Sequence, residues 1–167
     1  MSWTPRNKII DTRFIGRNIL QFVKDNDEDA LNWANGGTNL KEFQQFSESI
    51  ANRSKPIFPS VAIVADSNAT NFDSDLLASG YEITLEVMVH GAVAADVPLL
   101  ARRYKHALES LLRNIPSGTL LTGTSTVLDS RVSSIETQFD ELKTNDMQNS
   151  FLQMFQTKVV YMFYTQR

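Results

Sequence analysis

The sequence contains no cysteine. A chain without thiols cannot form disulfides, zinc–thiolate sites or iron–sulfur clusters, and it has no thiol nucleophile, so this composition suits a reducing compartment. Long apolar runs are missing as well. The start of the chain, MSWTPRNKIIDTRF, has no apolar core like that of a signal peptide, and no run approaches the roughly 18 apolar residues of a membrane span. We therefore expect a soluble intracellular protein with no membrane contact.

The sequence also lacks a large excess of positive or negative charge. The formal net charge is −3, which gives no electrostatic reason to expect nucleic acid or an anionic membrane as the main partner. The chain has 167 residues, of which 42% are apolar and 21% charged. These values predict one folded domain over residues 1–167, large enough to bury a core without disulfides.

Motifs for ligand binding are incomplete. The acidic run from Asp25 to Gly36 has acids spaced as in a calcium loop, but Ala30 replaces its glycine and Gly36 its bidentate glutamate. Residues 118–125, GTLLTGTS, have the glycine spacing of a phosphate-binding loop, but Thr124 replaces the lysine and the segment follows a predicted helix. We interpret both segments as polar loops. No dinucleotide-binding motif and no nucleophile elbow is present.

The two histidines, His90 and His106, are isolated from each other in the sequence. Neither lies at ligand spacing from another histidine or an acidic pair, so we expect them to be surface or interface residues. One alternative stays open. A small enzyme or ligand-binding domain can use His90 oriented by Asp96, or the loop at 118–125.

Apolar periodicity predicts helices in the first third of the chain. Residues 9–24 have apolar side chains at helical spacing, and the acidic segment 25–37 is expected to be a loop. Over 40–54, the spacing of Leu40, Phe43, Phe46 and Ile50 favours a second helix. Phe-rich segments also form strands, so both structures remain open for 40–54. Residues 59–66 predict a short buried strand, followed by a polar connection to Gly80.

The stretch GYEITLEVMVHGAVAADVPLLARRYKHALESLL, residues 80–112, predicts a strand followed directly by a helix. Side chains alternate over 81–90, and an apolar stripe over 97–115 predicts a helix that begins at Asp96 as its cap. Two further strands are expected at 128–142 and 151–164. This order predicts an α+β fold: a mixed or antiparallel sheet of about four strands with helices packed on one face.

The sequence predicts two surfaces that can contact other molecules. The polar face of strand 81–90 and the long aromatic strand 151–164 would leave sheet surface that a monomer must protect, which favours an oligomer; a covering helix is an equally open alternative. The outer face of helix 97–115 is basic. It either faces solvent or meets an acidic patch of a neighbouring subunit, or DNA.

The segments ALNWANGG and PSVAIVAD, residues 80–112 and the late strand pair together resemble the tail terminator and neck proteins of tailed bacteriophages. The resemblance implies a subunit of a ring, commonly a hexamer, that caps the tail tube and joins it to the head connector. It implies that the subunit has no catalytic activity, metal or cofactor. It also implies that the subunit contacts tube proteins and can contact sheath proteins, and that DNA can pass through the lumen without specific binding. Such a protein is found in the host cytoplasm during assembly and then in the virion.

Under this resemblance the long loops 65–79 and 116–128 would make contacts along the tail axis. The residues that we expect at interfaces are Glu82, Thr84, Glu86, Met88, His90, Arg102, Arg103, Lys105, Arg113, Tyr161 and Phe163. Two alternatives remain beside the enzyme: another head–tail joining protein of the adaptor or stopper type, and an adaptor domain that binds a partner strand at a sheet edge.

Overall fold

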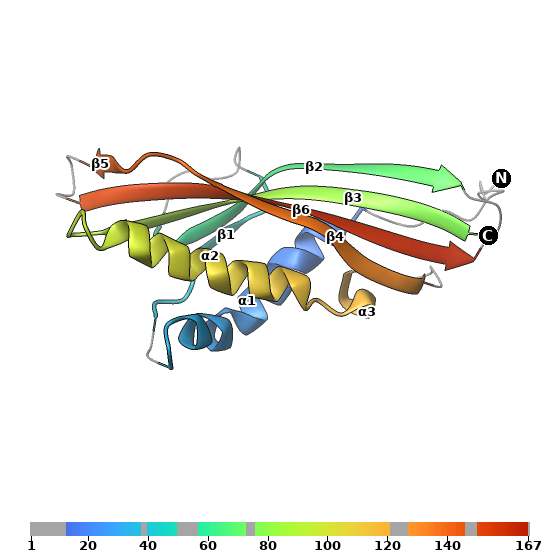
Figure 1. Ribbon diagram of the computed structural model, residues 1–167, viewed down its shortest axis with the longest axis horizontal. Coiled ribbons are helices and arrows are strands. Elements are labelled where there is room, and N and C mark those ends of the chain that lie inside the picture. Colours follow the sequence, from blue (N-terminus) through green and yellow to red (C-terminus); the bar gives the residue numbers. More distant parts are fainter. Residues whose placement is uncertain are drawn as a thin grey trace, which may run out of the picture.

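The structure is a computed structural model that describes residues 13–37, 40–49, 57–72, 76–120, 127–145 and 150–166. Two long helices, α1 and α2, and the short α3 lie on one side of a six-stranded mixed sheet (Figure 1). The predicted α+β class with helices on one face is confirmed, with six strands instead of about four. The elements are α1 (Ile15–Ala34), β1 (Gln45–Ser47), β2 (Ser60–Phe72), β3 (Leu76–Gly91), α2 (Val97–Arg113), α3 (Ser117–Leu120), β4 (Val127–Phe139), β5 (Lys143–Asn145) and β6 (Ser150–Gln166).

The strand order is β1-β2-β3-β6-β4, and β5 also pairs with β6. β1 and β2 are parallel, and all the other pairs are antiparallel. β3 and β6 pair along their whole described length, from Leu76 opposite Gln166 to Gly91 opposite Phe151. Both strands are therefore interior strands, so they can meet a neighbouring subunit through their faces but not through their edges. The edges of the sheet belong to β1 and β2 on one side and to β4 and β5 on the other.

The core lies between the sheet and the helices. Alternate residues of β3 and β6 are buried against the helix layer, as the period of two along strand 81–90 predicts. Each fully buried aliphatic or aromatic side chain contributes about 1.5–3 kcal/mol to folding. The helices supply the other half of this core, with Ile15, Ile19, Val23 and Leu31 from α1 and Val97, Ala101, Tyr104, Leu108, Leu111 and Leu112 from α2.

The acidic run is helical and not a loop. α1 continues through Asp25 and Asp29 to Ala34, because Val23, Asp27 and Leu31 keep facing the core at helical spacing while the other acids point outward. A helix cannot wrap its acids around a cation, so the structure also excludes the calcium-loop geometry. The predicted start of this helix, at residues 9–12, lies outside the described residues.

Residues 40–49 form no helix, which decides the open alternative against a helix for the part of 40–54 that the structure describes. The Phe43 N–H donates to the buried Asp27 carboxylate at 3.0 Å, and Gln44 N–H donates to the Pro59 carbonyl at 2.8 Å. These bonds replace the i to i−4 bonds that a helix would form here. The following residues, Gln45–Ser47, form β1 and pair with β2. Residues 50–54 lie outside the description.

The predicted loop at 65–79 is mostly strand. β2 and β3 pair from Ser60 opposite Met88 to Phe72 opposite Leu77, with a bulge between Ile63 and Ala65. Backbone pairing accommodates polar side chains on a strand, so the polar composition was misleading here. The predicted loop at 116–128 contains α3 and ends in β4, while 121–126 lie outside the described residues. No described helix is both long and apolar enough to cross a membrane.

Helix α2 is the element that the sequence predicts best. It begins after Asp96, with Pro98 in its first turn, although the Asp96 side chain forms no capping hydrogen bond. Its last carbonyls are satisfied in three ways: Ser110 O accepts from Asn114 Nδ2, Leu111 O accepts from Asn114 N–H, and Leu112 O accepts from the Tyr161 hydroxyl. The C-terminal end of α2 is thereby fixed to the central strand β6.

Candidate assembly surfaces

Within the described residues, the two histidines lie apart and each contacts an aromatic ring. The His90 ring packs on Phe58 with centroids 5.0 Å apart, and the His106 ring stacks on Trp33 at 4.7 Å. No hydrogen bond joins His90 to Asp96, and no group of three histidine or carboxylate side chains gathers within the part of the chain that the structure describes. The described residues therefore place both histidines in aromatic contacts, and the exposed surfaces become the candidate sites.

The helix-free face of the sheet is the first candidate surface. It is formed by the side chains of β3 and β6 that point away from the helices. Met88 lies opposite Met154, Glu86 opposite Gln156, Thr84 opposite Lys158, and Glu82 opposite Val160, and His90 ends the β3 row opposite Leu152. No helix in the described ranges packs on this face (Figure 1).

Polar contacts within the helix-free face include one ion pair and one hydrogen bond between β3 and β6. Glu82 forms an ion pair with Lys158 at 3.3 Å, and Gln156 donates to the buried Glu86 carboxylate at 3.4 Å. Beside these groups, Met88 and Met154 are only partly buried. Methionine adapts its shape to different partners, so a pair of methionines between polar groups is typical of contact surfaces.

A second candidate surface runs along α2. Leu99, Arg102, Arg103 and His106 occupy positions i, i+3, i+4 and i+7, so they form one stripe on the outside of the helix. Trp33 of α1 stacks on His106, and we call these five residues the α2 stripe. Trp33 is 58% exposed and Leu99 53% exposed. In the described chain Arg102 and Arg103 form no ion pair.

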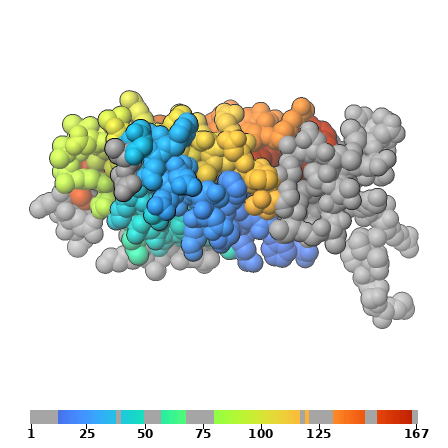
Figure 2. Space-filling view, turned by 90° about the horizontal axis from the view of Figure 1, so that it is seen from below, coloured from blue at the N-terminus to red at the C-terminus, as the bar shows by residue number. Residues whose placement is uncertain are grey.

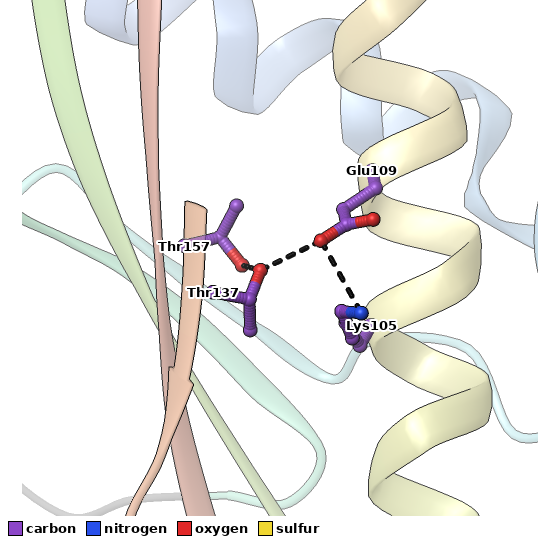
Figure 3. Close-up of polar contacts among 4 residues, drawn as sticks. All are labelled: Lys105, Glu109, Thr137 and Thr157. Carbon is purple, nitrogen blue, oxygen red and sulfur yellow. Dashed lines mark hydrogen bonds and ion pairs between the residues drawn. The ribbon is translucent and has the colours of Figure 1, made fainter. Parts of the chain in front are cut away.

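Lys105, by contrast, is engaged within the subunit. Its ammonium lies 3.6 Å from Glu109, whose carboxylate accepts a hydrogen bond from Thr137 of β4 at 2.8 Å (Figure 3). The Thr137 hydroxyl is in turn 2.9 Å from that of Thr157 on β6. Lys105 therefore serves the contact between α2 and the sheet. Arg113 lies exposed in the last turn of α2, where a cation is favourable for the helix dipole.

Tyr161 and Phe163 are not on a surface. Both side chains are buried between β6 and the helices, and the Tyr161 hydroxyl donates to Leu112 O at 2.8 Å. Burial raises the pKa of Tyr161, so its hydroxyl remains protonated as that bond requires. The period of two along β6 places these residues on the same face as Phe155, and we remove both from the expected interface.

The sequence interpretation missed two exposed features. Trp33 belongs to the segment 25–37 that was expected to be a loop, but it lies in α1 and stacks on His106 of α2. The segment Phe139–Leu142, which we call the strap, was included in the predicted strand 128–142, although β4 ends at Phe139. The combination of two apolar and two acidic residues, FDEL, was a usable signal for an exposed connection.

Comparisons with known proteins assign no family. No family model and no curated protein matches the chain. Among solved structures, one chain from "Virion of native gene transfer agent (GTA) particle" is 10% identical, with 91% of this chain and 94% of that chain covered and a TM-score of 0.48. At this identity and TM-score the likeness establishes neither a shared fold nor a shared function.

Proposed function

We propose that this chain is a structural protein of a phage-type virion, a tail terminator whose copies form a ring that caps the tail tube and meets the head connector. The observation that carries the proposal is the helix-free face of the sheet. It presents a Met88–Met154 pair among polar groups, on the side that no described helix covers. The α+β subunit that the family resemblance implies agrees with the observed sheet and helices.

Two physical properties of the subunit support the proposal: its long strands and the apolar side chains on its helix-free face. A subunit that works by shape needs extended contact surfaces and a rigid framework, and here four strands of 13 residues or more provide both. Apolar side chains on an otherwise polar face gain free energy when a partner excludes water from them, at about 25 cal/mol per Å². In this proposal the helix-free face contacts the tube or the connector.

Electron microscopy of the purified chain, alone and with tail tubes of its phage, tests the proposal. We expect rings, and rings at the ends of tubes. Met88→Lys places a charge in the centre of the helix-free face and should abolish tube capping without unfolding the subunit. The matched control is Gln21→Lys, which adds the same charge on the exposed side of α1. Binding to the head connector alone would assign the chain to the other head–tail joining proteins. Binding to neither partner contradicts the proposal.

A further inference from the structure

The α2 stripe combines exposed apolar surface with positive charge that forms no ion pair among the described residues. Trp33 and Leu99 are more than half exposed, and Arg102 and Arg103 lie between Leu99 and His106 on the same side of the helix. No acidic residue belongs to this stripe. Exposed tryptophan beside arginine is the composition that is enriched at the energetic centres of protein interfaces. The α2 stripe is therefore complementary to a partner surface that carries acidic and apolar side chains.

The strap has the opposite charge and a similar apolar content. Phe139 is 39% and Leu142 37% exposed, and the two residues between them, Asp140 and Glu141, are exposed acids. Neither acid forms an ion pair within the part of the chain that is described. One short segment thus presents two carboxylates between two apolar side chains.

The strap is also held in place before any partner arrives. Asp140 N–H donates to Met154 O at 2.9 Å, and Gln153 Nε2 donates to Asp140 O at 3.0 Å. The Phe139 ring packs on Phe155 with centroids 5.2 Å apart. These contacts fix the strap backbone to β6, so binding through its side chains costs little additional ordering.

We propose that the α2 stripe of one copy binds the strap of a second copy. This inference rests on the proposed function, because it supplies the contact by which copies assemble. The two surfaces differ within one chain, so the contact is heterologous, and repetition of a heterologous contact produces a ring or a filament. Charge complementarity selects a second copy as the partner: Arg102 and Arg103 would face Asp140 and Glu141, and neither pair forms an ion pair among the residues that the structure describes.

Figure 2 shows how the helix layer is arranged. α1 covers the middle of the face, α2 lies next to it, and β4 follows along the edge beyond α2. The stripe is on the exposed side of α2, and the strap follows the end of β4 at the edge. An exposed helix face and a sheet edge on one subunit are surfaces that two copies can join without disturbing the core.

Charge exchange tests the contact in the full-length chain. Arg102→Glu/Arg103→Glu and Asp140→Lys/Glu141→Lys should each weaken self-association about tenfold or more, as measured by sedimentation velocity at about 0.1 M salt. An equimolar mixture of the two variants pairs an acidic stripe with a basic strap and a basic stripe with an acidic strap. The mixture, and the chain with all four substitutions, should regain assembly.

Controls separate this contact from general charge effects and from misfolding. Lys24 is exposed on α1 without an ion pair among the described residues. Lys24→Glu therefore reverses one positive charge outside the α2 stripe, as each of the two arginine substitutions does within it, and should assemble like the wild type. Circular dichroism and thermal melting verify that every variant is folded. Restored assembly in the mixture also excludes misfolding as the cause.

Three results would contradict a contact between the α2 stripe and the strap. If both charge-reversed variants still form rings and cap tubes, the stripe–strap contact is wrong while the proposed function stands. If the reversed variants lose assembly but the mixture does not regain it, the two surfaces do not bind each other. If Arg102→Glu/Arg103→Glu keeps assembly but loses affinity for a labelled DNA oligonucleotide, the stripe is a nucleic-acid surface and the inference is wrong.

Discussion

The hydroxyl of Thr137 donates a hydrogen bond to the Glu109 carboxylate, with 2.8 Å between the oxygens. Thr137 has a single hydroxyl proton, and it is donated to Glu109. In the bond between the two threonine hydroxyls, which are 2.9 Å apart, Thr157 is therefore the donor and Thr137 the acceptor. The chain of bonds joins the edge strand β4 and the central strand β6 to α2. It fixes the position of α2, and therefore of the α2 stripe, relative to the sheet.

Replacement of Thr137 by valine should reduce the free energy of unfolding by about 1–3 kcal/mol, because the buried Thr157 hydroxyl loses its acceptor and Glu109 its donor. Urea denaturation provides the measurement. Thr84→Val is the control: Thr84 lies on the helix-free face of β3, its hydroxyl has no partner among the described residues, and we expect a change within about 0.5 kcal/mol. Equal effects of the two substitutions would show that the Thr137 bonds do not stabilise the fold.

Tyr161→Phe should also destabilise the subunit by about 1–3 kcal/mol. It removes the donor that satisfies Leu112 O at the end of α2, in a buried environment where water cannot replace it. The same substitution at Tyr164, three residues on in β6, removes only an exposed bond from Arg131. We expect Tyr164→Phe to change the unfolding free energy by about 0.5 kcal/mol or less. A comparable loss in both variants would contradict the role given to the Tyr161 hydroxyl.

Asp27 makes stability depend on pH. Burial raises the pKa of its carboxyl above 3.8, and the hydrogen bond from Phe43 N–H only partly opposes this shift. In the interval between 3.8 and the raised pKa, the folded chain therefore binds more protons than the unfolded chain. Asp27 thus lowers the stability of the fold as pH rises through that interval.

Asp27→Asn removes this dependence while its side-chain oxygen can still accept from Phe43. The unfolding free energy of the variant minus that of the wild type should increase as the pH rises from about 3.5 to 7. Any constant offset from the amide group does not affect this trend. Denaturation series across the pH range measure it, and a difference that falls with pH would contradict the assigned pKa shift.

Local periodicity predicted the elements whose pattern is complete in the sequence. Helix 97–115 was found nearly at its true position, and strand 81–90 was found as the second part of β3, because each buries one regular face; β6 was found for the same reason. The second half of α1 was missed, since its buried stripe passes through Asp27 and the acidic composition resembles a loop. Asp27 is tolerated there because a distant residue, Phe43, satisfies its carboxylate.

The candidate surfaces depend on contacts that local pattern does not contain. β1 is defined by its pairing with β2, from Gln45 opposite Ser60 to Ser47 opposite Ala62, and this contact is not visible in the phenylalanine spacing of residues 40–54, which suggested a helix. The stacking of Trp33 on His106 joins two helices more than 70 residues apart in sequence. The basic residues of α2 were predicted correctly as one outer face, but only the structure separates Lys105, which binds Glu109, from Arg102 and Arg103, which form no ion pair in the described part of the chain.

The mass of the full-length chain in solution is the most direct test of the account. Sedimentation equilibrium up to about 50 µM, combined with electron microscopy, should show closed rings whose mass is an integral multiple of 18.8 kDa. The assembly should dissociate in the Arg102→Glu/Arg103→Glu variant and reform when this variant is mixed with Asp140→Lys/Glu141→Lys. A chain that stays at 18.8 kDa over this whole concentration range and does not bind tail tubes would contradict the assignment as a ring-forming virion protein.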